Sequence, residues 1–274
     1  MLARYQEQAR VIAGGTDLLI ALKEHAERPA YVISLASIPG WRYIEYDEAQ
    51  GLRIGAATTV RSVETSPIVR AKYPVLAVAA GLLASIQIRN LATVAGNICR
   101  ASPSADMPPA LLVLRATVKL VGSAGDRLVP LEEFFTGPGR TVLQPDELLA
   151  EIQVPPPHPQ TGAVYIKHSP RRAMDLAVVG VAALVALEGG RCVEARIALG
   201  AVAPTPRRAP AAEEILRGRE PTAVRIEDAA RAAAELASPI SDLRGTAKYR
   251  RQMVHVLTRR ALDGALAQTL EGAP

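Results

Sequence analysis

The 274-residue sequence predicts an α+β fold built from two consecutive parts. Four prolines within Pro155–Pro159 exclude regular structure there, because proline fixes φ and has no backbone N–H to donate. Strand and helix signals alternate before this segment. After it, three strand signals are followed by two helix signals, which is the order expected of a small α+β domain. We therefore expect a domain boundary at the proline segment.

The first part opens with a strand–turn–helix–strand pattern. Arg10–Ala13 is a short apolar run, Gly14–Gly15 indicates a turn, Thr16–His25 has the pattern of an amphipathic helix, and Tyr31–Leu35 indicates a second strand. This order favours a parallel pair of strands. Further along we predict a strand at Leu52–Ala57, a buried Ala- and Leu-rich helix at Pro74–Ser85, and an apolar section Ala110–Val121 that becomes a β pattern at Thr117–Val121.

The second part predicts a three-stranded antiparallel sheet followed by helices. The strands are expected at Ala163–Lys167, Leu176–Leu187 and Cys192–Ala201, with Glu188–Arg191 as a hairpin turn. Pro221 and Thr222 open an Ala-rich helix that runs to Ala237. A second helix is indicated by a spacing that keeps one face apolar: Val254, Leu257, Ala261 and Ala265.

Composition restricts the class of protein. Apolar residues make up 49% and charged residues 22%, which is typical of a globular protein. The net charge of +5 comes from dispersed arginines and only 4% of residues are aromatic, so we expect no nucleic-acid partner. No apolar run reaches the roughly 18–20 residues of a membrane span, and charges interrupt Met1–Arg10 where a signal peptide would be apolar. We expect a soluble, cytoplasmic protein.

Cysteine and histidine are scarce. Cys99 and Cys192 lie far apart, and the four histidines have no metal-ligand spacing, so the chain is expected to hold neither a metal nor an iron–sulfur cluster. One disulfide is arithmetically possible, although a reduced thiol is favoured in the cytosol. Any redox chemistry in this chain would therefore need an organic cofactor.

Two glycine-containing loops could bind an anion. Backbone amides at a glycine turn that opens a helix can converge on a negative group, and both Ala13–Asp17 and Thr93–Asn97 fit that description. Neither matches a phosphate-binding Walker loop or the dinucleotide fingerprint, so each loop alone is better explained as an ordinary turn. Two such loops together favour a pyrophosphate. Ser102 and Asp106 could then bind other hydrogen-bonding groups of a cofactor, although Asp106 could instead cap a helix at Pro108–Leu114.

A longer set of motifs follows one order along nearly the whole chain: Ala13–Leu19, Ile54–Ala56, Gln87–Asn90, Thr93–Asn97, Ala101–Pro103 with Asp106, Pro145–Leu149, Lys167 with Arg171 and Asp175, Gly200–Pro206, and Tyr249–Arg251. In this order and at these spacings the chain resembles the FAD-binding (medium) subunits of molybdenum hydroxylases, which include the carbon monoxide dehydrogenase medium chain and the flavin subunit of xanthine dehydrogenase. The resemblance implies an FAD-binding domain of the PCMH, or vanillyl-alcohol-oxidase, type at residues 1–157, made of two subdomains with FAD between them. Residues 163–270 would form the C-terminal domain of molybdenum-hydroxylase flavoproteins.

The resemblance also implies roles for individual residues. Backbone amides would hold the FAD pyrophosphate at Ala13, Gly14, Gly15, Thr16 and Asp17 and at Thr93, Val94, Ala95, Gly96 and Asn97. Asp106, with Ser102 nearby, would contact the ribityl chain or the flavin edge. Leu149 would pack against a cofactor ring, and Lys167 would lie near the flavin and stabilise its reduced, anionic form. The residues themselves leave two alternatives open, Leu149 as a core aliphatic and Lys167 as a surface cation. No catalytic acid or base is required.

The chain departs from the family pattern at two places. Ala95 stands where the family usually has glycine, and if that position required a positive φ or close phosphate approach, its methyl group would weaken FAD binding. Only thirteen residues precede Gly14, fewer than in the family, so we expect a strand and part of a helix of the first subdomain to be missing.

The function implied by the resemblance is electron transfer. A molybdopterin-binding large subunit would oxidise the substrate, two [2Fe-2S] clusters in a small subunit would pass the electrons on, and FAD in this chain would deliver them to NAD or a quinone. The assembly would be a heterotrimer, possibly doubled, with molybdopterin and iron only in the partner subunits. Two alternatives stay open: a stand-alone flavin oxidase on the same fold, and a flavin-free scaffold subunit. A flavin spectrum separates the scaffold from the other two, and neighbouring genes for molybdenum and iron–sulfur subunits separate the complex subunit from the oxidase.

Overall fold

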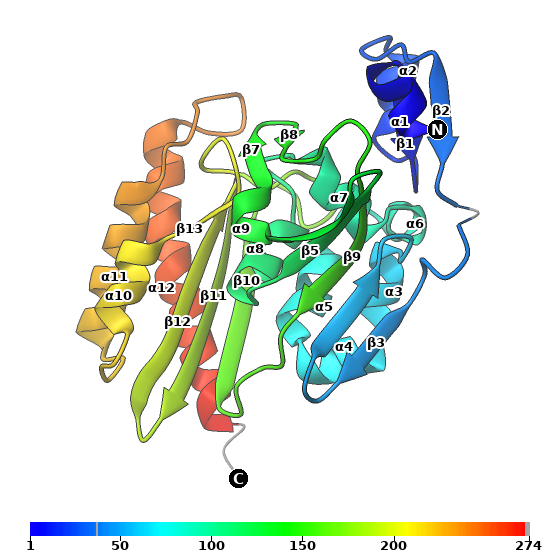
Figure 1. The fold of residues 1–274 in the computed structure, drawn as a ribbon. Helices are drawn as coiled ribbons and strands as arrows, with labels where there is room; N and C mark the ends of the chain where they lie inside the picture. Colours follow the sequence, from blue (N-terminus) through cyan, green and yellow to red (C-terminus); the bar gives the residue numbers. More distant parts are fainter. Residues whose placement is uncertain (37, 272–274) are drawn as a thin grey trace.

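A computed structural model describes residues 1–36 and 38–271, and its chain is divided among three units (Figure 1). The N-terminal unit contains α1 (Leu2–Tyr5), the 3₁₀ turn η1 (Gln6–Gln8), β1 (Ala9–Ile12), α2 (Leu18–Lys23) and β2 (Tyr31–Ser34). β1 and β2 pair in parallel, from Ala9 opposite Tyr31 to Ile12 opposite Ser34, so the predicted parallel pair is confirmed. α2 is shorter at both ends than the predicted helix Thr16–His25.

The second unit is a five-stranded antiparallel sheet covered by short helices. Its strand order is β3-β4-β9-β5-β6, with β3 (Ile44–Asp47), β4 (Gly51–Gly55), β5 (Thr117–Gly122), β6 (Gly125–Pro130) and β9 (Leu148–Val154). The helices are α3 (Val60–Thr65), α4 (Pro67–Lys72), α5 (Pro74–Leu82), α6 (Ile86–Leu91), α7 (Val94–Arg100), α8 (Met107–Val113) and α9 (Leu131–Phe134), and a small hairpin joins β7 (Phe135–Gly137) to β8 (Arg140–Thr141). The predicted strand at Leu52–Ala57 and the predicted helix at Pro74–Ser85 correspond to β4 and α5. The apolar section Ala110–Val121 divides into the end of α8 and the strand β5.

The third unit is an antiparallel sheet of four strands, not the three that the sequence predicts. β10 (Thr161–His168), β11 (Val179–Glu188) and β12 (Arg191–Gly200) correspond to the predicted strands. The fourth strand, β13 (Arg207–Arg208), pairs only with Ala198 and Leu199, and so short a segment has no recognisable periodicity. α10 (Pro210–Leu216), α11 (Ala223–Leu236) and α12 (Ala247–Glu271) follow it.

The turn between β11 and β12 and the linker before β10 both agree with the sequence. Gly189 and Gly190 form the hairpin turn with φ of 55° and 76°, values that glycine adopts without strain. The first four residues of the proline-rich segment, from Pro155 to His158, join β9 to β10 without regular structure.

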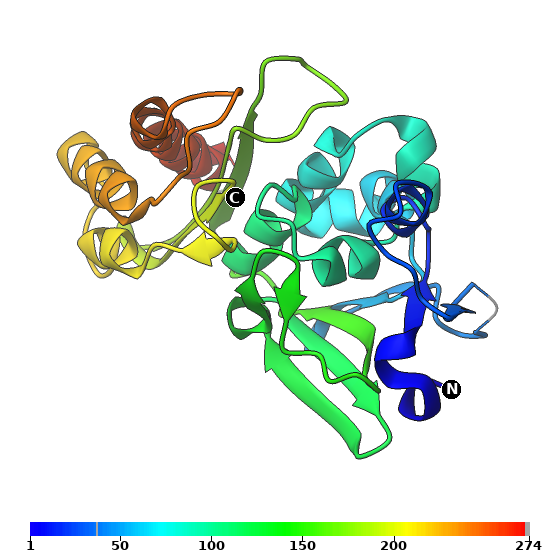
Figure 2. The same ribbon diagram turned by 90° about the horizontal axis from the view of Figure 1, so that it is seen from above.

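The sheet of the third unit is buried on both faces (Figure 2). Side chains on one face, such as Ala182 and Leu184 of β11, belong to the core shared with α5 and α8. The alternate residues Val181, Ala183 and Val185 belong to a second core under α10, α11 and α12. Burial on both faces explains the uncharged run Ala177–Leu187, because an antiparallel strand with one wet face would alternate apolar and polar residues.

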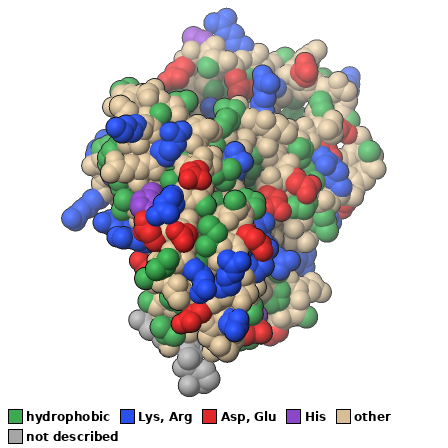
Figure 3. Space-filling model, turned by 90° about the vertical axis from the view of Figure 1, so that its left-hand side faces the viewer, with side chains coloured by type: hydrophobic (Ala, Val, Ile, Leu, Met, Phe, Trp, Pro, Cys, Tyr) green, Lys and Arg blue, Asp and Glu red, His purple; other side chains and the backbone are tan. Residues whose placement is uncertain are grey.

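The outer face of the helical layer carries both signs of charge. Figure 3 shows Lys and Arg side chains interspersed with Asp and Glu side chains on this side of the molecule. Among the described residues, no helix is long and apolar enough to cross a membrane.

Candidate functional site

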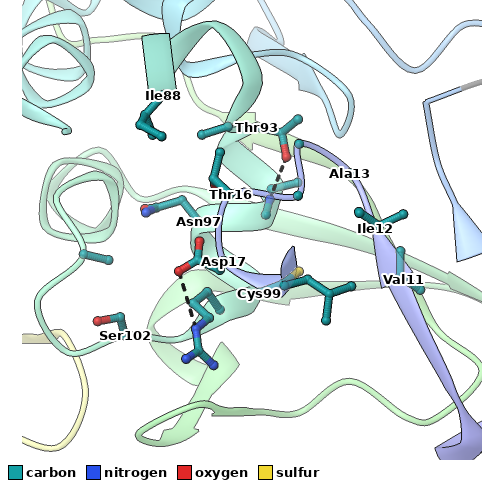
Figure 4. Close-up of a pocket in the computed structure, with 18 of the residues that line it drawn as sticks. Val11, Ile12, Ala13, Thr16, Asp17, Ile88, Thr93, Asn97, Cys99 and Ser102 are labelled. Carbon is teal, nitrogen blue, oxygen red and sulfur yellow. Dashed lines mark hydrogen bonds and ion pairs between the residues drawn. The ribbon is translucent and has the colours of Figure 1, made fainter. Parts of the chain in front are cut away.

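A cleft of about 660 Å³ lies where the three units meet, a size typical of ligand sites. Its walls come from the loop after β1, from α6 and α7, from the segment before α8, from the start of β9, and from Met174–Leu176 between β10 and β11 (Figure 4). All of the predicted site residues line this cleft except Val94 and Lys167. Val94 is 1% exposed and packs in the core.

The loop after β1 requires its two glycines for different reasons. A Cβ on Gly14 would lie 2.0 Å from the carbonyl oxygen of Leu91, so only glycine lets this loop contact the backbone between α6 and α7. Gly15 has a φ of 72°, a left-handed conformation that favours glycine. The first loop therefore packs against Leu91 and Ala92, the two residues that precede the second loop.

The first loop carries a run of amides that are available for a ligand. The backbone N–H groups of Ala13–Asp17 donate to no acceptor among the described residues, and the loop lines the cleft. Backbone amides normally find a partner when they are out of bulk water. A set of neighbouring amides facing a cleft is suited to an anionic group.

The second loop offers fewer amides than the sequence suggests. The amide of Val94 donates to the carbonyl of Thr58 at 3.2 Å. Gly96 donates to Oγ1 of Thr93 at 3.0 Å, and Asn97 donates to the Thr93 carbonyl at 3.0 Å. Only the amides of Thr93 and Ala95 lack an acceptor among the described residues.

Ala95 causes no backbone strain. It lies in the first turn of α7 and does not have a positive φ. Ala95 lines the cleft and is 5% exposed. The position therefore does not require glycine for conformational reasons, and only the approach of a ligand could be affected.

A buried acceptor in the cleft wall has no partner. Oδ1 of Asn97 is inaccessible to solvent and accepts no hydrogen bond from any described residue. Figure 4 shows the Asn97 side chain beside Thr16. A buried polar atom without a partner costs free energy, which a donor group on a ligand would recover.

The neighbouring Cys99 is a poor nucleophile, because burial raises the pKa of its thiol to about 12.

Asp106 is held by two side chains of β10 and does not cap α8. Its Oδ1 accepts a hydrogen bond from the hydroxyl of Tyr165 at 2.9 Å, and its Oδ2 pairs with Nζ of Lys167 at 2.8 Å. Lys167 also donates to the carbonyl of Leu82 at 3.1 Å, and its side chain is 6% exposed. The surface-cation alternative for Lys167 is therefore wrong, and so is the capping alternative for Asp106, whose side chain makes no cap hydrogen bond.

The pKa of Asp106 reflects two opposing effects. Burial raises it above the usual range, whereas the charge of Lys167 and the hydrogen bonds from Lys167 and Tyr165 lower it. Burial raises the pKa of Tyr165 even further from its usual range, so this hydroxyl remains a donor.

The third unit supports the segment that carries Ser102 and Asp106. The amide of Ala201 donates to the carbonyl of Pro103 at 2.7 Å. A Cβ on Gly200 would lie 2.9 Å from Cγ of Pro109, so the Gly200–Pro206 motif packs closely on this segment.

Sequence reasoning missed Tyr165, which does not line the cleft but donates a hydrogen bond to Asp106. It could have been found, because it shares one face of β10 with Lys167 at a spacing of two. Leu149 is both core and cleft wall, since it is 4% exposed and lines the cleft. Arg100, at the end of α7, and Met174, with a φ of 54°, also line the cleft, and no sequence signal pointed to either. Among the described residues, no cluster of three or more His, Cys, Asp or Glu is placed to hold a metal.

Comparisons with known proteins identify the family. Residues 1–157 match the FAD binding domain in molybdopterin dehydrogenase, and residues 164–265 match the CO dehydrogenase flavoprotein C-terminal domain. The carbon monoxide dehydrogenase medium chain of Hydrogenophaga pseudoflava is 36% identical over 268 residues, which cover 98% of this chain and 93% of the relative. The putative xanthine dehydrogenase FAD-binding subunit of Escherichia coli is 34% identical over 261 residues, covering 95% and 89%.

A solved structure agrees with the sequence comparisons. The carbon monoxide dehydrogenase of H. pseudoflava that lacks the Mo-pyranopterin moiety of the molybdenum cofactor superposes with a TM-score of 0.94 and 37% identity, covering 97% of this chain and 92% of that one. The predicted α+β architecture, an FAD-binding domain followed by a flavoprotein C-terminal domain, is confirmed. The chain belongs to the FAD-binding (medium) subunits of molybdenum hydroxylases, and it is a subunit of an oxidoreductase.

Proposed function

We propose that this chain binds FAD in the cleft and carries electrons through it, from [2Fe-2S] clusters of a small subunit to an external acceptor such as NAD or a quinone. A molybdopterin-binding large subunit would complete a heterotrimer, and residues 1–157 and 163–270 would be the two domains of this chain. The observation that carries the proposal is the run of unpaired amides at Ala13–Asp17 in a cleft of about 660 Å³. FAD, when bound, supplies the redox chemistry of its isoalloxazine ring.

The residues of the cleft suit that cofactor. The amides of the first loop, together with those of Thr93 and Ala95, would bind the pyrophosphate. Oδ1 of Asn97 would accept a hydrogen bond from a donor on FAD, which would satisfy its missing partner. Leu149 would exclude water from a cofactor ring.

Asp106 and Lys167 would act together near the flavin. Asp106 lines the cleft, whereas Lys167 lies behind it and pairs with its carboxylate. Lys167 would therefore orient Asp106 and balance its charge, in addition to stabilising negative charge on the nearby ring. Ser102 would contact the same part of the cofactor from the neighbouring loop.

The first experiment is to purify the chain, record its visible absorbance and identify any flavin released on denaturation. We expect stoichiometric, non-covalent FAD. If the folded chain is colourless, it is co-expressed with candidate molybdenum and iron–sulfur subunits. A complex that still lacks FAD would disprove the proposal and favour a scaffold subunit.

An experiment on the direction of electron flow requires the assembled complex. FAD absorbance should bleach when the substrate of the large subunit is added, and it should recover on mixing with NAD or a quinone. A chain that is reduced directly by a small substrate without its partners would instead be a stand-alone flavin oxidase.

A further inference from the structure

The cleft is poor in positive charge for a site that would take a pyrophosphate. Five acidic residues line it: Asp17, Glu27, Asp106, Glu147 and Asp175. Cations outside the lining pair with the last three, so the charges of Asp17 and Glu27 are balanced only by lining residues. The described lining residues include two cations, Arg10 and Arg100. A pyrophosphate diester adds two negative charges to this surface, and backbone amides supply only partial positive charge in return.

Arg10 is already committed to other partners. Its Nε donates to Glu27 at 2.6 Å, and its Nη1 donates to the carbonyls of Glu7 and Ala9, each at 3.0 Å. Redirecting this guanidinium toward a ligand would break all three hydrogen bonds and leave Glu27 unpaired.

Arg100 has no such commitments. Its Nε lies 3.6 Å from Oδ1 of Asp17, beyond hydrogen-bond distance, and it donates no hydrogen bond to any described residue. The Arg100 side chain is 53% exposed and that of Asp17 is 59% exposed, so their attraction is largely screened by solvent. The pair joins the end of α7 to the first loop, and both of its residues line the cleft. The guanidinium therefore lies beside the loop that carries the unpaired amides.

We propose that Arg100 is the cationic partner of the cofactor pyrophosphate, and that on binding its guanidinium turns from Asp17 to the phosphate oxygens. This inference rests on the proposed FAD site. The guanidinium presents a fork of N–H donors that matches two phosphate oxygens. The weak contact with Asp17 leaves these donors unused. This rotation of the guanidinium also neutralises the negative charge that the pyrophosphate would otherwise place next to the Asp17 carboxylate.

The test compares Arg100→Gln and Arg100→Lys with the wild type. The dissociation constant of FAD is measured by flavin fluorescence at low and high KCl, in whichever form of the wild type retains FAD, the chain alone or the complex. We expect Arg100→Gln to weaken FAD binding about tenfold at low salt and to flatten its salt dependence. Arg100→Lys keeps the charge but loses the fork, so its affinity should lie between the other two.

A matched control and the contrary outcomes define the result. Arg231→Gln removes an arginine from α11 that is 61% exposed and also pairs with an acidic residue, so it should leave FAD affinity unchanged. If the wild type binds FAD and Arg100→Gln binds it equally well, the role of Arg100 is wrong while the FAD site stands. A loss of affinity with unchanged salt dependence and a lowered melting temperature would mean structural damage and would also overturn the role. A wild type that binds no FAD in either form would overturn both proposals.

Discussion

At the scale of single residues, the ion pair of Asp106 and Lys167 shows how burial changes the pKa of a carboxyl group. The Asp106 side chain is 7% exposed and that of Lys167 is 6% exposed, so solvent screens neither charge well. Burial raises the pKa of Asp106, and the cation opposes that rise. Removing one member of such a pair leaves a buried charge without compensation, which costs more than the intact pair contributes.

We predict that Lys167→Met destabilises the protein in a pH-dependent way. Without the cation, the pKa of Asp106 rises further above its unfolded value, so folding favours the protonated acid. The stability of the variant therefore falls as the pH rises through that interval. The loss relative to the wild type should be about 3 kcal/mol near neutral pH and clearly smaller at about pH 4. Urea denaturation of both proteins at the two pH values measures it.

An exposed ion pair provides the control for this prediction. Lys119 pairs with Asp126 at 2.8 Å, and their side chains are 38% and 54% exposed. Lys119→Met should leave stability nearly unchanged at either pH, because solvent screens this exposed pair. An equal loss for Lys167→Met at both pH values would show that Asp106 is not the group responsible.

At the scale of secondary-structure elements, the N-terminal unit is the least supported part of the chain. Neither α1 nor α2 has a buried residue, and α2 is only six residues long, too short to be stable by itself. β2 exposes Tyr31 and Val32, at 44% and 46%. Gly14 of this unit packs closely on Leu91 and Ala92 of the second unit.

Hydrogen exchange should therefore be fastest in this unit and should respond to the cofactor. We expect amides of the first loop and of α2 to exchange fastest without FAD and to become protected when FAD binds, because the loop amides would gain acceptors. Amides of β11, which is buried on both faces, should exchange slowly in both states and serve as the internal reference. Equal exchange of the first loop with and without FAD would contradict its role in binding.

At the scale of the whole molecule, the second and third units share a core. Ala163 and Tyr165 of β10, together with Ala182 and Leu184 of β11, pack in the same core as α5 and α8. The other face of that sheet packs under α10–α12. The sheet is thus shared between the two halves of the sequence, and neither half can bury its apolar surface without the other.

This sharing predicts that the chain unfolds in one transition. Trp41, the one tryptophan of the sequence, packs against the core of the second unit, so its fluorescence reports on the first half of the chain. Far-UV circular dichroism reports on the whole. The two curves in urea should coincide, whereas a fluorescence transition that precedes the loss of helix signal would show that the halves unfold independently.

The sequence predicted the long elements better than the short ones. β10, β11, β12 and α11 were found because each is long enough to show its periodicity. α3, α4, α6 and α7 were missed because six or seven residues cover less than two turns. Their starts were nevertheless encoded, since each begins at a Ser or Thr that caps it through the side chain: Thr59, Ser66, Ser85 and Thr93.

The sequence by itself determined the family, the irregular proline linker, the two-glycine loop and about a third of the residues that line the cleft, 12 of 35, because these are local patterns of residue type and spacing. Only the tertiary structure decided which groups remain free to bind. The amide of Val94 is occupied by a carbonyl from Thr58, and the carboxylate of Asp106 is occupied by Tyr165 and Lys167. These partners lie far away along the chain, and only folding brings them within hydrogen-bond distance. No local sequence pattern could therefore reveal which donors and acceptors of the cleft remain without a partner in the protein.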